Sequence, residues 1–182
     1  GDTVSGGAGV DTIVLTANNQ TVIDAAFANK TLIEAIITAN GTNSLTLGTN
    51  AAAATANLTV TGGTGNDTID ASGLGEALNI AGGAGANVLT GSNQADTITG
   101  GSDGDTITGG AGNDSLVGGD GANRFQFGAG EFVAGDTVSG GTGIDTIVFT
   151  ADSQTIADEA YANKTLIEAI ITANGTNSLT LG

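Results

Sequence analysis

The stretch Gly109-Gly110-Ala111-Gly112-Asn113-Asp114-Ser115-Leu116-Val117 follows the pattern Gly-Gly-x-Gly-x-Asp-x-aliphatic-x, and the chain repeats this nine-residue unit. Residues 62–70 and 140–148 also follow it, and weaker copies fill the region between Gly62 and Gln126. Glycines allow tight left-handed turns and leave backbone carbonyls uncrowded. An aspartate at the sixth place adds a hard anionic oxygen, the ligand type that calcium prefers. The aliphatic residue at the eighth place is expected to point inward from a short strand.

Strand-like runs recur along the whole chain every 9 to 13 residues. Their apolar markers are Ile13, Ile23, Ile33, Leu45, Leu58, Ile69, Leu78, Leu89, Ile98, Ile107, Leu116, Phe125, Val138 and Ile147. Short strands at this cadence predict an all-β solenoid rather than alternating strands and helices. The segment Asp24–Ala39 fits this reading through its branched residues, but its apolar spacing leaves a short helix open as an alternative.

A second and much longer repeat joins the two ends of the chain. Residues 1–48 and 135–182 are 134 positions apart, and 39 of their 48 positions are identical. From Ala28 to Gly48 the match to Ala162–Gly182 is complete. We therefore expect the chain to be an excerpt of a tandem array, with about seven turns in each period if two strands make a turn. Uncapped solenoid ends also favour end-to-end self-association.

Composition excludes several classes of function. Nineteen acidic residues against three basic ones give a formal net charge of −16, which argues against nucleic acid and against anionic membrane surfaces. No apolar stretch approaches the roughly 20 residues of a membrane span, so no membrane insertion is expected. The chain lacks histidine and cysteine, which excludes Ser-His-Asp, Cys-His and zinc arrangements. We therefore expect a protein that is not an enzyme.

The nonapeptide resembles the calcium-binding unit of the RTX (repeats-in-toxin) family. The resemblance implies an all-β parallel β-roll, a β-solenoid that binds Ca²⁺ in its Gly/Asp-rich turns. Two nonapeptides make one turn in that family, so each site joins sixth-place residues of successive turns. The implied pairs are Asp96 with Asp114, Asp105 with Asn123, Asp67 with Asn87, and Asp114 with Asp136. Carbonyls of Gly100, Gly109 and Gly118 would complete the coordination, and Asp103 and Asp120 lie in the same loops.

The sequence departs from the family pattern at several positions. Asn87 and Asn123 are neutral, which is expected to weaken their sites. Asp11 and Asp145 border a segment without the nonapeptide, where a loop aspartate that bonds to backbone amides is an equal alternative to a metal ligand. The glycine–aspartate loop is absent from residues 14–58, which are expected to continue the solenoid without metal.

The repeats divide the chain into three expected regions. Residues 1–61 form a non-RTX solenoid segment opened by one RTX-like unit, residues 62–126 form the nonapeptide β-roll, and residues 127–182 begin the next period. The resemblance implies a module that is secreted unfolded by a type I system and folds in extracellular calcium. Its expected role is structural, in a filament, a surface layer or an adhesin stalk. The alternatives are an accessory module of a secreted protease, lipase or epimerase, and a ligand-binding Thr/Asn face.

Overall fold

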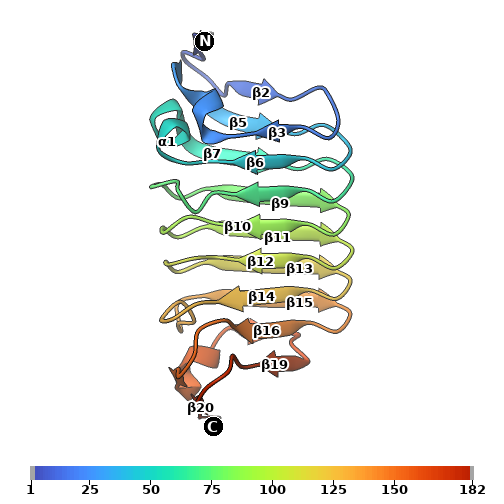
Figure 1. Ribbon diagram of the computed structural model, residues 1–182, viewed down its shortest axis with the longest axis vertical. Helices are drawn as coiled ribbons and strands as arrows, with labels where there is room; N and C mark the ends of the chain where they lie inside the picture. The colour runs from blue at the N-terminus through green and yellow to red at the C-terminus, as the bar shows by residue number, and fades with distance from the viewer. Residues whose placement is uncertain (1–2, 181–182) are drawn as a thin grey trace.

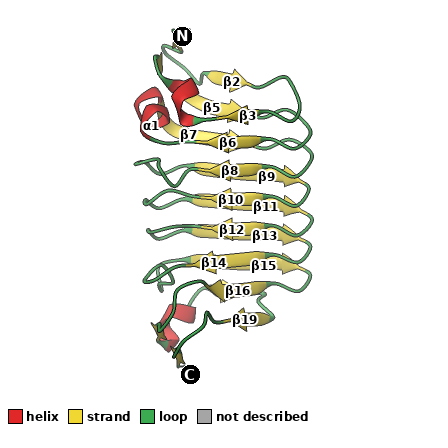
Figure 2. Cartoon of the chain, in the orientation of Figure 1, coloured by secondary structure: helices red, strands yellow, loops and turns green. Residues whose placement is uncertain are grey.

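Two long parallel sheets face each other along the molecule in the computed structural model, which describes residues 3–180 (Figures 1 and 2). Sheet 1 consists of β2 (Thr12–Val14), β5 (Ile33–Ile37), β7 (Thr55–Thr61), β9 (Asn79–Ala84), β11 (Thr97–Ser102), β13 (Ser115–Asp120), β15 (Thr137–Thr142) and β18 (Lys164–Thr165). Sheet 2 consists of β3 (Thr21–Val22), β6 (Ser44–Thr46), β8 (Thr68–Asp70), β10 (Val88–Thr90), β12 (Thr106–Thr108), β14 (Arg124–Phe127), β16 (Thr146–Phe149) and β19 (Ala169–Ile171). The chain alternates between the sheets and therefore winds as a parallel β-solenoid, which confirms the expected fold class.

Short elements occupy the turns and the ends. Strands β1 (Val4–Ser5) and β4 (Lys30–Thr31) form one two-stranded sheet, and β17 (Thr155–Ile156) and β20 (Ser178–Leu179) form another. The helices are the 3-10 turns η1 (Asp24–Phe27) and η2 (Asp158–Tyr161) and the α-helix α1 (Thr49–Ala54). Among the described residues, no helix is long and apolar enough to cross a membrane.

The core consists of two columns of inward side chains, one from each sheet. In sheet 1 the parallel register places Ile80, Ile98 and Leu116 on adjacent strands, and in sheet 2 it places Leu89 beside Ile107. All five are at most 3% exposed. Each coil covers the apolar face of its neighbour, which allows a core without large rings over most of the length. The prediction that Ile23 marks an inward strand position is wrong: Ile23 is 58% exposed, and Val22 packs against the core instead.

Both expectations for residues 24–39 are correct in part. The first four residues form η1, and Ile33–Ile37 forms strand β5 in sheet 1. The helix ends early because Asn29 adopts a positive φ of 64° and the branched residues that follow pair with neighbouring strands. The segment thus turns a corner of the coil and then rejoins the sheet.

Aromatic residues gather where the second copy of the long repeat begins. The ring of Phe132 makes edge-on contacts with Phe127, Phe149 and Tyr161 at centroid distances of 4.9–5.1 Å. Lys164 lies over the same ring and donates hydrogen bonds to the carbonyls of Val133 and Asp136. Burial lowers the pKa of Lys164, against the opposing effect of Asp136. This cluster fills the wider coil that follows β14.

The two copies of the long repeat occupy different faces of the coil. Strand β2 lies in sheet 1, whereas its counterpart β16, 134 residues later, lies in sheet 2. Likewise β3 and β6 lie in sheet 2, but their counterparts β17 and β20 form the separate two-stranded sheet. From β2 to β15 the chain makes six turns, and β16 adds one more face. One period is therefore slightly shorter than the expected seven turns and is not a whole number of turns.

Removal of core side chains tests the column packing. We expect Ile98→Ala to lower the free energy of unfolding by about 2–5 kcal/mol, because a fully buried isoleucine leaves a cavity between two identical layers. Val117→Ala is the matched control, since Val117 lies on the neighbouring strand and is 37% exposed. Urea unfolding in saturating calcium measures both, and equal effects of the two substitutions would contradict the assigned register.

Candidate metal sites along the two edges

The residue two positions before each inward aliphatic or aromatic residue lies in a turn, and these residues form two vertical rows. Turns from sheet 1 to sheet 2 lie on the right in Figure 1, and turns from sheet 2 to sheet 1 lie on the left with α1. We name the right-hand row the alternating edge; it contains Asn43, Asp67, Asn87, Asp105, Asn123 and Asp145. The left-hand row, the carboxylate edge, contains Asp96, Asp114 and Asp136. All nine residues are buried.

On the alternating edge, each side chain accepts a hydrogen bond from the backbone of the coil before it. Oδ1 of Asp105 accepts from the Asn87 N–H at 2.7 Å, and Oδ1 of Asn123 accepts from the Asp105 N–H at 2.9 Å. The same bond links Asn43 to Asp67, Asp67 to Asn87, and Asn123 to Asp145. Gln20 and Glu168 extend the row at its two ends. Because amide and carboxylate side chains alternate from Asn43 to Asp145, Asp67 and Asp105 have neutral neighbours in the row, whereas Asp145 lies between Asn123 and Glu168.

The carboxylate edge has the same bonds but no neutral spacer. The Leu78 N–H donates to Asp96, the Asp96 N–H donates to Asp114 at 2.9 Å, and the Asp114 N–H donates to Asp136 at 3.0 Å. Asp96 also accepts from the backbone and hydroxyl of Ser92. Three buried carboxylates therefore stack in successive coils.

The structure brings together every pair that the resemblance implied. Asp96 with Asp114, Asp114 with Asp136, Asp105 with Asn123, and Asp67 with Asn87 are each joined by one ladder hydrogen bond. Coordination of calcium by these pairs stays a prediction. Two of the four pairs offer two carboxylates and the other two offer one, so the charge available to a divalent cation is greater on the carboxylate edge.

The predicted glycine carbonyls lie against the ladder side chains. A Cβ on Gly100 would collide with Oδ2 of Asp105 and with the carbonyl of Gly118, and a Cβ on Gly91 would collide with Oδ2 of Asp96 and with the carbonyl of Gly109. These contacts place carbonyl and carboxylate oxygens around a space that only glycine leaves free. Asp103 and Asp120, by contrast, are exposed, and each accepts a hydrogen bond from a neighbouring coil, from Gly85 and Thr142 respectively.

Asp11 and Asp145 occupy equivalent sequence positions but lie on opposite edges. Asp145 is fully buried in the alternating edge, and Asp11 lies half-buried before β2 on the left. The backbone N–H of Asp11 donates to Glu34, and that of Asp145 donates to Glu168. The ladder partner of each of these aspartates is therefore a glutamate, which the nonapeptide pattern missed. One signal identifies it: Glu34 and Glu168 each stand two residues before Ile36 and Ile170, as Asn43 does before Leu45.

The oxygen atoms present fit a hard divalent cation. Oδ2 atoms of Asp11, Asp105 and Asp145 are buried without a hydrogen-bond partner. Within residues 3–180, no three acidic side chains converge on one point, so backbone carbonyls must supply the remaining ligands. Carboxylates combined with carbonyls are the donor set that Ca²⁺ takes, whereas the chain has no histidine or cysteine for softer metals. The ladder carboxylates and the glycine carbonyls would hold such an ion. A bound Ca²⁺ supplies only charge neutralisation.

Burial and mutual repulsion shift the acidities of these carboxyls. The pKa of Asp114 is raised to about 6, chiefly by burial and also by the charges of Asp96, Asp136 and Glu131, while the hydrogen bond from the Asp96 backbone N–H acts to lower it. Burial also raises the pKa of Asp96 and of Asp105. The carboxylate edge therefore disfavours its own ionised state when no cation is bound.

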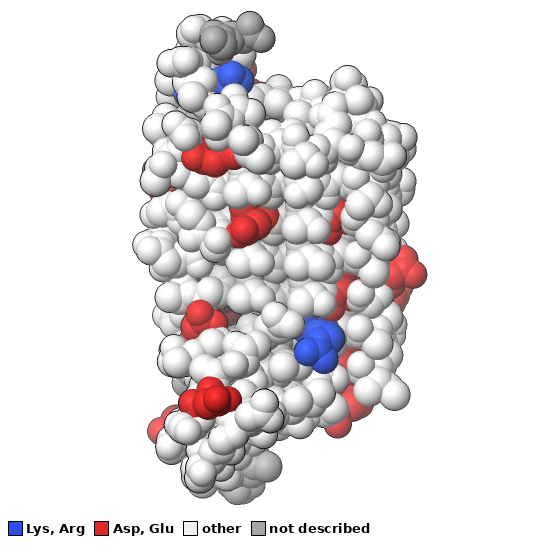
Figure 3. All heavy atoms as spheres, viewed as in Figure 1, with Lys and Arg blue, Asp and Glu red and all other residues white. Residues whose placement is uncertain are grey.

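Little of this charge reaches the surface. Six of the predicted ligands (Asp67, Asp96, Asp105, Asp114, Asp136 and Asp145) are at most 2% exposed. The face viewed in Figure 3 is mostly uncharged, with separated acidic patches on it and along its margins. Six of the nineteen acidic residues thus lie in the interior of the turns, where solubility does not require them.

A lower pH is expected to stabilise the calcium-free fold but to weaken calcium binding. The folded pKa of Asp114 lies above the ordinary value of 3.8, so its protonation stabilises the calcium-free fold below about pH 4, and that stability is lost as pH rises through about 6. Calcium needs the ionised form, so its apparent affinity should fall about tenfold between pH 7 and pH 5. Calorimetric titration at both values measures this, and unchanged affinity would contradict the assignment.

Neutralising one carboxylate separates repulsion from ligation. Asp114→Asn keeps an oxygen that can accept the Asp96 N–H, as Asn123 does for Asp105 on the other edge. We expect it to stabilise the fold in chelator and to weaken calcium binding by about tenfold or more, because ligand charge sets affinity. Asp152→Asn is the control, since Asn18 stands at the equivalent place in the first copy. If Asp114→Asn instead lowers the stability in chelator, the inferred repulsion between the stacked carboxylates is refuted.

Comparison with known proteins agrees with the geometry of the turns. A family model described as the RTX calcium-binding nonapeptide repeat (4 copies) matches residues 1–19, 59–73, 79–107, 99–131 and 134–148. Together these segments cover more than half of the chain, and they contain every ladder aspartate described above. No curated protein and no solved structure matches the chain.

Proposed function

Because this chain belongs to the RTX calcium-binding nonapeptide repeat family, we propose that it is a calcium-stabilised structural repeat module of a large secreted bacterial protein that forms an extracellular filament, a surface layer or an adhesin stalk. Members of the family are calcium-binding repeat proteins that bacteria typically secrete. The structural role, the assembly and passage through a type I system are parts of the proposal.

The 134-residue repeat carries this proposal. Two nearly identical segments lie in one continuous solenoid, and the coils between them connect without a break in either long sheet. An accessory module that assists one catalytic domain has no need of such long-range duplication. A structural element that gains length by adding units does need such duplication. The family roll is a structural motif that also occurs in some enzymes, so an accessory role is the competing outcome of the experiment below.

Calcium would act on this module as a folding switch. In its absence, stacked carboxylates repel each other and the glycine turns lose much entropy on ordering. When it binds, the free energy of binding adds to that of folding. Extracellular calcium modules bind at about 10⁻⁴–10⁻³ M, so the same chain is expected to stay unfolded inside a cell and to fold outside it.

A calcium titration tests the proposal. Far-UV circular dichroism from chelator up to about 10 mM calcium is expected to show a coil-to-β transition in the millimolar range. Electron microscopy of the same samples should then show fibres of uniform width. A transition that leaves only monomers would favour the accessory-module role. Complete β structure in chelator would refute a calcium-driven fold.

A further inference from the structure

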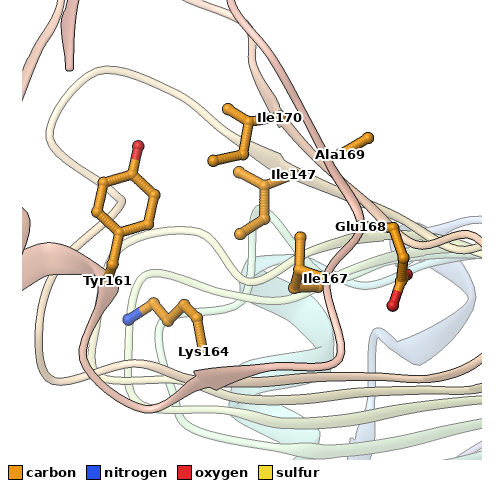
Figure 4. Close-up of a pocket in the computed structure, with 7 residues that line it drawn as sticks. All are labelled: Ile147, Tyr161, Lys164, Ile167, Glu168, Ala169 and Ile170. Atoms are coloured by element: carbon orange, nitrogen blue, oxygen red, sulfur yellow. The ribbon is translucent and has the colours of Figure 1, made fainter. Parts of the chain in front are cut away.

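The last coil of the structure exposes an apolar surface beside the ladder contact between Asp145 and Glu168. Ile147, Ile167 and Ile170 line an open hollow of about 350 Å³ there, with Tyr161 and Lys164 at its side (Figure 4). Ile170 is 38% exposed, and Ile167 and Leu179 are half-buried. Exposed isoleucine side chains on an edge strand, which has no partner strand on its outer side, are costly in water, so the surface is suited to an occupant.

The molecule contains an internal reference for this surface. Residues 162–182 repeat residues 28–48 without a difference, so Ile167, Ile170 and Leu179 correspond to Ile33, Ile36 and Leu45. Those three counterparts are only 2%, 0% and 1% exposed. Because the sequences are identical, the difference arises from what covers each copy.

The cover of the first copy is a helix followed by a strand. Strand β7 pairs with β5 and places Val60 beside Ile36, and β8 places Ile69 beside Leu45. Within the cover itself, Ala51 of α1 and Leu58 of β7 are at most 1% exposed. Residues 49–61 therefore cover the apolar face of β5, and β8 covers that of β6.

A carboxylate fixes the start of this cover. Asp24 accepts hydrogen bonds from the backbone N–H groups of Gly48, Asn50 and Ala51 at 2.8–3.1 Å. Burial alone would raise the pKa of Asp24, but these bonds and the Asn50 side chain outweigh it and lower the pKa. An anionic group at the first turn of α1 also complements the helix N-terminus. Asp158 stands at the same place in the second copy.

We propose that the surface formed by residues 158–180 is a docking site for a helix–strand segment with the sequence of Thr49–Thr61, carried by a following 134-residue unit. This inference rests on the proposed structural role and names the partner that the role requires. The following unit continues both long sheets, and its strand corresponding to β7 adds to β19. Since β19 lies in sheet 2 and β5 in sheet 1, that unit sits one face further around the coil.

The N-terminal end of a second molecule fits this surface less well. That end exposes β1 and β2, whose counterparts β15 and β16 are covered by β13 and β14. Its own residues 49–61 already lie between β5 and β9. A second copy that docks end to end therefore offers neither the helix nor the free strand that covers Ile33 and Ile36.

Covalent extension of the whole chain tests the proposal. The extended protein carries a second copy of residues 49–182 directly after Gly182, and Ile170→Cys introduces the only thiol of the chain. In saturating calcium, we expect alkylation of this thiol to be at least about tenfold slower in the extended protein than in the chain without extension, because docking buries it. Ile36→Cys in the chain without extension gives the rate for the covered position.

A matched extension separates docking from added length. With Leu58→Asp and Val60→Asp in the appended unit only, the thiol is expected to react as fast as it does without any extension. Fast alkylation in the unmodified extended protein would overturn the proposal. If alkylation is slow in the chain without extension, and becomes slower as the protein concentration rises, the occupant is a second copy of the chain and the assigned occupant is wrong. Circular dichroism reports separately on the proposed function: β structure that persists in calcium alongside fast alkylation overturns the docking alone.

Discussion

A carboxylate buried in the turn of a parallel coil must be matched by amide donors or by a cation, and this constraint shapes the molecule. The ladder bonds from backbone N–H groups satisfy one oxygen of each ladder aspartate and set the distance between coils. The second carboxylate oxygen lies beside the glycine loops, and Oδ2 of Asp105 and of Asp145 accepts no hydrogen bond there. Folding and ion binding are therefore coupled at the same atoms.

The two edges meet this constraint differently. On the alternating edge, Asn87 and Asn123 separate the charges of Asp67, Asp105 and Asp145, so the row tolerates burial with less repulsion. On the carboxylate edge, Asp114 lies between two like charges, and burial together with these charges raises its pKa. The carboxylate edge is thus the side of the roll where a bound cation would relieve the most repulsion.

Sequence predicted the class of the fold from its short strand-like repeats, and the resemblance to the RTX family implied the pairing of the turn residues. The ladder side chains at Asn43, Glu34 and Glu168 escaped the nonapeptide pattern, although their distance from the next inward residue is the same. The contact of Asp24 with α1 also escaped it, since a gap of more than twenty residues joins two coils of irregular length. The rotation of one repeat against the next had no local signal, because it depends on the summed lengths of all the wide and narrow coils.

That rotation has a mechanical consequence. A roll of two sheets is broader than it is thick, so it bends more easily across its flat faces than along them. If every unit of 134 residues advances by one of the two faces, the long sheets stay continuous and the rod keeps one easy bending direction along its length. Any surface group of the repeat then recurs alternately on the two opposite faces of the rod rather than along a single side.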